Sequence, residues 1–148
     1  MSIQNPICST HYISQMSEDD KILFIRILIA LSHIDKELQK SEKTFIRNMA
    51  TMFRIPEEKT PSIDTSPSVE EIIKEAASIK NRNIALHIIK EICFLANSDG
   101  NLSNEEMLFI GQVGQAMGIE LEKIAQISQW IIDYLVWIEN SKIIFEEN

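Results

Sequence analysis

The sequence predicts an all-α fold: a compact single domain of two duplicated helix hairpins with connecting and closing helices. Apolar side chains recur at helical spacing along most of the chain, and the alternation typical of strands is absent. The segment around Asp35 also recurs around Asp99, at an offset of 64 residues. The pairs that match under this offset are Leu31 with Leu95, Leu38 with Leu102, Glu42 with Glu106, Phe45 with Phe109, Ile46 with Ile110 and Ile55 with Ile119.

Length and composition favour one domain and exclude some partners. With 148 residues, 45% of them hydrophobic, the chain can bury one core and is too short for two ordinary domains. The net charge of −8 argues against nucleic acid, because phosphate binding needs clustered lysine and arginine. Cys8 and Cys93 do not indicate a disulfide framework, and this favours a reducing, cytoplasmic setting.

Residues 1–16 are expected to form a polar leader before the helical domain at 17–140. They lack the basic and apolar segments of a signal peptide. The apolar stretch at 22–34 is interrupted by Arg26 and Ser32, and it is shorter than the roughly 20 residues that a membrane span needs. No transmembrane segment is therefore expected.

The first half of the domain, about 17–56, is predicted to be a helix hairpin. Ser17 is followed three residues later by Asp20, a pattern that caps a helix running to about Leu31. A second helix is expected over 42–53, and Pro56 marks its end. Three prolines between 56 and 68 then predict a loop that joins the two halves.

The second half, about 68–119, begins with a short helix capped by Ser68 and repeats the hairpin. Its first long helix is expected over 83–96. Ser103, with Glu106 three residues later, predicts the start of the partner helix. Gly118 is placed to end that helix in a left-handed conformation.

The closing helix, about 121–139, is apolar around most of its circumference, and a short tail at 141–148 follows it. A stripe of isoleucine and leucine runs beside an aromatic stripe of Trp130, Tyr134 and Trp137. One interpretation is a core helix that packs across both hairpins, since helices apolar on all sides are usually buried. The other is that the aromatic stripe binds a protein partner or forms a homodimer.

The second hairpin carries the run ANSDGNLSNEE at 96–106, followed by FI at 109–110 and MGI at 117–119. This pattern resembles the hallmark turn of the TerB-like tellurite-resistance family, and the resemblance covers about residues 20–140. It implies an all-helical fold with duplicated hairpins and a non-enzymatic role in tellurite and other stress responses. The family's acidic pair falls on Asp99 and Glu106, and in the first copy on Asp35 and Glu42.

These four acids are the candidate metal ligands, because carboxylate oxygens suit calcium, magnesium or manganese. The second copy is the better candidate, since the first has Lys36 where the second has Gly100. A full EF-hand is not expected, because Leu95 stands where the first aspartate ligand belongs. The alternative is structural: Glu106 can cap its own helix by accepting from the Ser103 amide.

Enzymatic motifs are absent from the sequence. We find no glycine-rich phosphate loop and no nucleophile elbow. His87 and Glu91 share a helical face at i and i+4, and a surface pair explains them. The sequence therefore predicts a binding module with two alternative modes: a divalent cation at the acidic turns, or a protein partner on the aromatic stripe.

Overall fold

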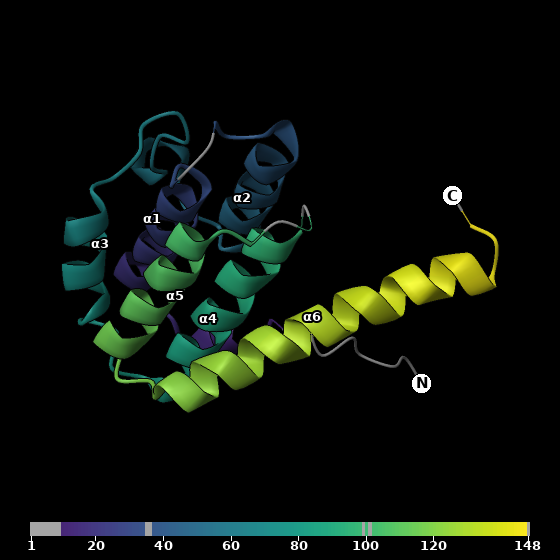
Figure 1. Ribbon diagram of the computed structural model, residues 1–148. Coiled ribbons are helices and arrows are strands. Elements are labelled where there is room, and N and C mark those ends of the chain that lie inside the picture. Colours follow the sequence, from purple (N-terminus) through teal and green to yellow (C-terminus); the bar gives the residue numbers. More distant parts are fainter. Residues whose placement is uncertain (1–9, 35–36, 99, 101, 148) are drawn as a thin grey trace.

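The all-α prediction is confirmed by the computed structural model, which describes residues 10–34, 37–98, 100 and 102–147 and has no strand within these ranges (Figure 1). Six α-helices and two 3-10 helices make up the described part. In chain order they are η2 (His11–Gln15), α1 (Glu18–Ser32), α2 (Lys40–Met52), η3 (Glu57–Lys59), α3 (Val69–Ala76), α4 (Arg82–Asn97), α5 (Asn104–Ala116) and α6 (Leu121–Ile144).

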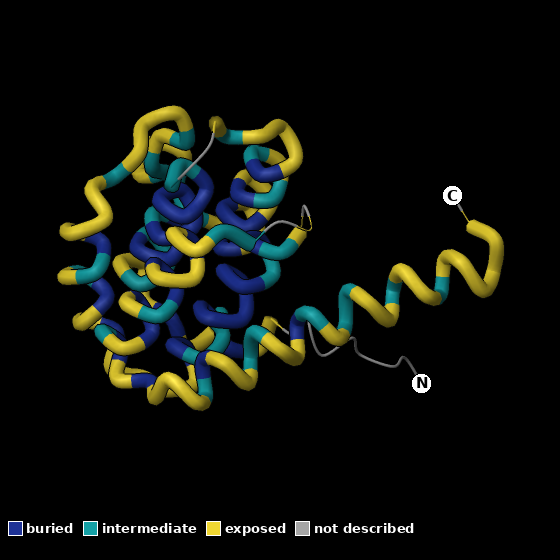
Figure 2. Tube along the Cα trace, viewed as in Figure 1, coloured by how far each residue is buried: buried dark blue, intermediate teal, exposed yellow. Residues whose placement is uncertain are grey.

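Helices α1 and α4 form the centre of the helical body. Helix α1 contacts α2, α3 and α4, while α4 also contacts α5, α6 and η2. From Leu23 to Ser32 every residue of α1 except Arg26 is buried, so this helix is covered on almost all sides (Figure 2). Arg26 reaches outward and forms an ion pair with Glu75 of α3. The nearly continuous apolar sequence of α1 follows from this central position.

The helix starts predicted from serine caps are confirmed. The amide of Asp20 donates to Ser17 Oγ at 3.1 Å, and the amide of Glu106 donates to Ser103 Oγ at 3.1 Å. Ser68 accepts a longer bond, of 3.4 Å, at the start of α3. Each side-chain oxygen satisfies a backbone amide that has no partner within its helix.

Helices α2 and α5 end in the same way. The predicted left-handed residue Gly118 has a φ of +83°, and Arg54, 64 residues earlier, has a φ of +57°. Beyond each of them, one backbone amide bonds the carbonyl five residues back: Ile55 to Ala50 at 3.3 Å, and Ile119 to Gly114 at 3.0 Å. The left-handed conformation that Gly118 adopts after α5 is therefore also adopted by Arg54 after α2.

The segment before residue 17 differs from the expected polar leader. Residues 11–15 form η2, which packs against α4, and Tyr12 within it is buried. The Tyr12 ring lies 6.3 Å from the ring of Phe24 in α1. The packed core therefore begins before residue 17, because Tyr12 and Met16 are buried and Ile13 packs against the core.

Helix α6 differs from the expected closing helix in length and in position. It ends at Ile144, beyond the predicted end at 139. It contacts α4 and α5, and its only buried residues within the described chain are Ile124 and Ile131. The C-terminal part of the helix extends away from the body (Figure 1), so α6 does not pack across both hairpins. No helix in the described part of the chain combines the length and the apolar character that crossing a membrane requires.

Candidate functional site

Two of the four candidate metal ligands, Glu42 and Glu106, cap their own helices. Both side chains are buried, with relative exposures of 5% and 2%. Glu42 Oε1 accepts from the Gln39 amide at 3.0 Å, and Glu106 Oε1 accepts from the Ser103 amide at 3.1 Å. The cap predicted for Glu106 is thus confirmed. The other two candidates, Asp35 and Asp99, lie outside the described residues.

The two hairpins meet beside these caps. The rings of Phe45 in α2 and Phe94 in α4 lie 5.9 Å apart. A cavity of about 180 Å³ lies at this junction and is lined by Gln39, Ser41, Glu42, Phe45, Leu95 and Ser98. Residues from both turn regions therefore share one cavity. Among the described residues, no three or more His, Cys, Asp or Glu side chains gather in a way that could hold a metal ion.

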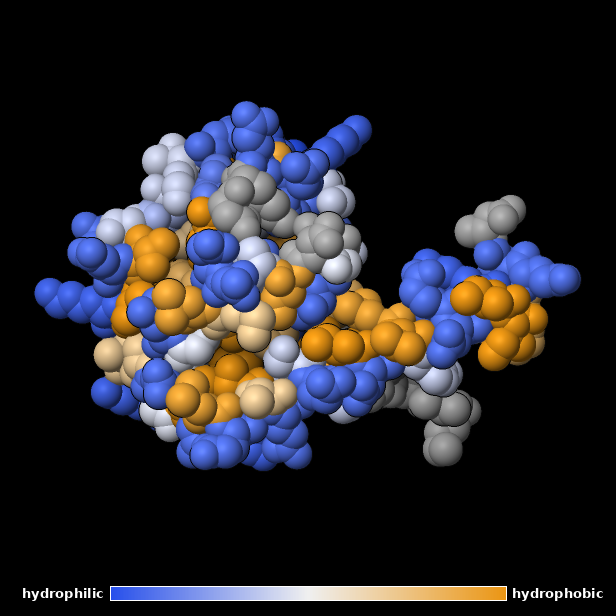
Figure 3. Space-filling view, viewed as in Figure 1, coloured by the Kyte–Doolittle hydropathy of each residue, from blue (hydrophilic) through white to orange (hydrophobic). Residues whose placement is uncertain are grey.

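The aromatic stripe on α6 spans two environments. Trp130 lies where α6 still packs against α4 and is 41% exposed, whereas Trp137 on the projecting part is 67% exposed. Tyr134 lies between them and is half-buried. Apolar atoms cover α6 where it leaves the body and again near its end (Figure 3). The exposed large apolar residues beyond Tyr134 are Val136, Trp137, Ile143, Ile144 and Phe145.

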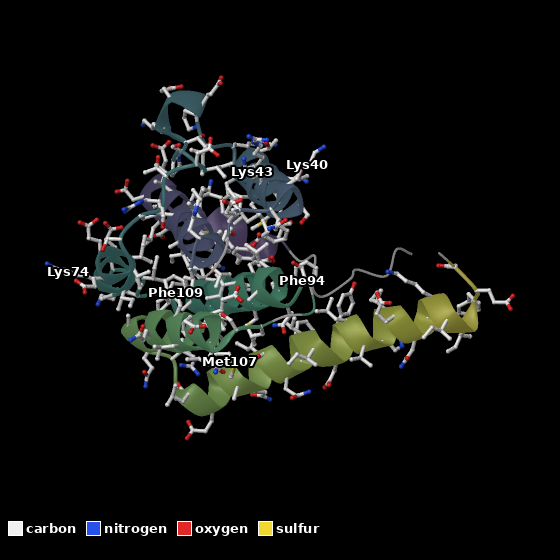
Figure 4. The ribbon with its side chains drawn as sticks, turned by 45° about the horizontal axis from the view of Figure 1, so that its top comes forward. Lys40, Lys43, Lys74, Phe94, Met107 and Phe109 are labelled. Carbon is white, nitrogen blue, oxygen red and sulfur yellow. The ribbon has the colours of Figure 1, made fainter. Side chains whose placement is uncertain are left out.

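The projecting part of α6 begins after Tyr134 and Leu135, the last residues of this helix that pack against the core within the described chain. Its side chains point away from the helix on all sides, while Met107 and Phe109 mark α5 within the body (Figure 4). Beyond Ile131, no residue of α6 is buried. This part of the helix is therefore an apolar surface without cover from the described residues.

A groove runs between α4 and the first half of α6, with a volume of about 340 Å³. It is lined by Asn83, Leu86, His87, Lys90, Lys123, Gln126, Ile127 and Trp130. At the starts of the two helices, Arg82 donates two hydrogen bonds to the carboxylate of Glu120, at 2.7 and 2.9 Å. This bidentate pair fixes one end of α4 relative to α6.

A cluster of four polar side chains borders this groove. The rings of Tyr12 and His87 stack with centroids 4.3 Å apart and planes 10° apart. Lys90 Nζ lies 5.4 Å from the centre of the Tyr12 ring and 3.3 Å from Glu91 Oε1. Lys90 and Glu91 are both buried, so a charged pair lies within the apolar sequence of α4.

Burial determines the protonation of this cluster. It lowers the pKa of His87 to about 4, with the charge of Lys90 adding to the effect. Burial also raises the pKa of Glu91, although Lys90 opposes that shift, and raises the pKa of Tyr12 above its ordinary value. His87 is therefore neutral near pH 7. Its Nδ1 atom is buried and has no hydrogen-bond partner among the described residues.

The sequence did not reveal this cluster. The predicted surface pair of His87 and Glu91 is wrong, because Glu91 is buried and pairs with Lys90, while His87 stacks on Tyr12. The signal was a lysine and a glutamate side by side inside an apolar helical run. Fully buried charges are rare unless they are paired, so such a doublet indicates a specific tertiary setting.

Comparisons of the chain with models of protein families, with curated proteins and with solved structures found no match. The resemblance to the TerB-like family stays a prediction from the turn sequence.

The chemistry of the groove suits binding better than proton transfer. An efficient general base has a pKa near the working pH, and the pKa of His87 lies about three units below neutrality. The lining of the groove nevertheless combines the indole of Trp130, the neutral imidazole of His87 and the ammonium group of Lys123, which a ligand could contact.

Proposed function

We propose that this chain is a non-enzymatic protein-interaction module that forms a homodimer through α6. The observation that carries the proposal is the apolar surface of the projecting half of this helix. Trp137 and Ile144 are 67% and 70% exposed there, and exposed apolar surfaces of this kind mark interaction sites. A second copy of the chain would supply the cover that the described residues do not.

The spacing of the side chains supports a helical partner. Trp130, Tyr134, Trp137, Ser141 and Ile144 follow one another at intervals of four, three, four and three residues. This is the a and d spacing by which two helices wind around each other. Val136 and Ile143, seven residues apart, add an apolar row on another side. In an isologous pair, each α6 would lie against the same stripe of its partner.

The experiment is light scattering coupled to gel filtration over a dilution series. We expect the mass of two chains at high concentration and of one chain on dilution. The double variant Trp137→Glu with Ile144→Glu should be monomeric throughout, because association would bury two carboxylates from each chain. The matched control, Leu108→Glu, alters an exposed apolar residue of α5 and should dimerise like the wild type. A monomeric wild-type protein at every concentration would overturn the proposal.

The second candidate function is divalent-cation binding in a TerB-like stress response. It is favoured by the cavity where the two hairpins meet, because Glu42 and Ser98 both line it. Asp35 and Asp99 would then supply carboxylate oxygens beside the capped helices. Calcium, magnesium and manganese are the fitting ions for such ligands. The cytoplasm is the proposed setting, since buried Cys93 is a free thiol.

Calorimetric titration with these three ions tests this candidate. Wild-type protein should release or absorb heat, and Asp99→Asn combined with Glu106→Gln should abolish it. The control variant Glu57→Gln with Glu58→Gln removes two carboxylates from η3 and should bind like the wild type. Equal heats from all three proteins, or none from any, would remove the cation role.

A further inference from the structure

The groove between α4 and α6 has a charge that contrasts with the rest of the protein. The chain carries a net charge of −8, yet the lining of the groove includes two lysines and no carboxylate. Glu91 Oε1 lies 3.3 Å from Lys90 Nζ and neutralises the charge of this lysine. Lys123 donates to the neutral oxygen of Gln126 at 2.9 Å, and the nearby carboxylate of Glu120, on which its charge also acts, is already paired with Arg82. The groove therefore keeps a positive charge, which favours an anionic ligand.

Apolar side chains form part of the walls of the groove. Leu86 and Ile127 are half-buried on opposite sides, and Trp130 presents part of its indole to solvent. A volume of about 340 Å³ falls at the lower end of the range of small-molecule sites, roughly 300 to 1,000 Å³. Aromatic rings pair well with such surfaces through offset or edge-to-face contacts.

Neutral hydrogen-bonding groups complete the lining. His87 Nδ1 is buried without a partner among the described residues, and a buried polar atom of this kind costs free energy unless a ligand or water satisfies it. The side-chain amides of Asn83 and Gln126 add donors at the groove. Together with Lys123, these groups can hold a carboxylate while the apolar walls hold a ring.

We infer that this groove binds a small aromatic carboxylate, with its ring between Leu86, Ile127 and Trp130 and its carboxylate at Lys123. The site goes beyond the proposed dimerisation: Trp130 belongs to both surfaces, but the other groove residues lie outside the dimer stripe, and Trp137 and Ile144 of the stripe lie outside the groove. An anion bonded to an ammonium group forms a charge-assisted hydrogen bond, so Lys123 should control the choice between acid and neutral ligands.

The test is calorimetric titration of the full chain with 2-naphthoate, and with 2-naphthalenemethanol as a neutral analogue of similar shape. Wild-type protein should bind the acid about tenfold more tightly than the alcohol, and Lys123→Gln should remove that preference. Lys142→Gln removes a lysine from the projecting part of α6 and is the matched control, with unchanged binding expected.

A second measurement locates the bound probe. The chain has two tryptophans, so Trp137→Phe leaves Trp130 as the single indole N–H signal in a nitrogen-correlated NMR spectrum. That signal should shift as 2-naphthoate is added. Absence of binding, equal affinity for the two probes, or binding that leaves the Trp130 signal unmoved would overturn the inference. The dimer-breaking double variant should bind 2-naphthoate normally, which separates this result from the proposed function.

Discussion

Gly114 of α5 lies against Ile124 of α6 so closely that a β-carbon on Gly114 would stand 2.4 Å from Ile124 Cδ1. Ile124 is one of the two buried residues of α6, and Gly114 is itself buried. The absence of a side chain at position 114 therefore sets how closely α6 approaches the body. A β-carbon on Gly111, one turn earlier, would stand 4.0 Å from the nearest atom, Leu121 Cδ2.

The first prediction compares alanine at these two glycines. Gly111→Ala should raise the free energy of unfolding by about 0.5–1 kcal/mol, because alanine leaves the unfolded chain less conformational freedom to lose than glycine does. Gly114→Ala should lower it by about 1–2 kcal/mol, since displacing Ile124 outweighs that gain. Urea unfolding followed by circular dichroism measures both. Equal stabilisation by the two substitutions would show that α6 does not pack tightly at Gly114.

The second prediction concerns the left-handed helix ends at Arg54 and Gly118. Arg54→Gly should raise the free energy of unfolding by about 0.5 kcal/mol, because a φ of +57° strains an arginine and not a glycine. Gly118→Ala should lower it by about 1 kcal/mol through backbone strain alone, since a β-carbon there meets nothing within 4 Å. Thermal unfolding of both variants checks the opposite signs, and a loss of stability in Arg54→Gly would contradict the assignment.

The third prediction is a pH dependence that comes from His87. The pKa of about 4 in the folded protein lies below the value of 6.5 for an ordinary histidine, so the unfolded chain binds the proton more readily. The contribution of neutral His87 to stability is therefore complete above pH 6.5 and is lost as the pH falls toward 4. Between pH 7.5 and pH 5, wild-type protein should lose on the order of 1–2 kcal/mol more than His87→Phe.

The phenylalanine variant keeps an aromatic ring stacked on Tyr12, so the comparison isolates the titration. Glu91 has a raised pKa and contributes with the opposite sign, but both proteins retain it and its effect cancels in the difference. Substitution of exposed His11 by asparagine serves as a control for loss of a surface histidine. Parallel stability curves for wild type and His87→Phe would contradict the assigned burial of the imidazole.

The fourth prediction uses Cys93 as a probe of α6. Burial raises the pKa of this thiol to about 12, although a hydrogen bond with Ser128 of α6 opposes the shift. In a Cys8→Ser background, Cys93 should react with a disulfide reagent only when α6 leaves α4 or the protein unfolds, because the thiolate is the reactive form. Gly114→Ala should accelerate the reaction. Labelling of the native protein at the rate of a free thiol would contradict the packing of α6 over Cys93.

Local signals made the helices predictable. Ser17 and Ser103 begin helices because their oxygens bond amides three residues away, and Gly118 ends one because it tolerates positive φ. The turn acids were only partly predictable, since Glu106 serves as a cap and its proposed partner Asp99 lies outside the described residues. Capping involves neighbours in sequence, whereas a metal site depends on how two turns meet in space.

The sequence by itself determined the all-α class, the hairpin order and the helix caps, because each depends on residues within a few positions of one another. Only the tertiary structure decided that Tyr12 stacks on His87, that Lys90 and Glu91 are buried together, and that Trp137 is left exposed. Helical periodicity states which side chains share a face but not which other helix covers it. Whether the aromatic side chains of α6 are covered depends on the direction of this helix, and its contacts with α4 and α5 set that direction.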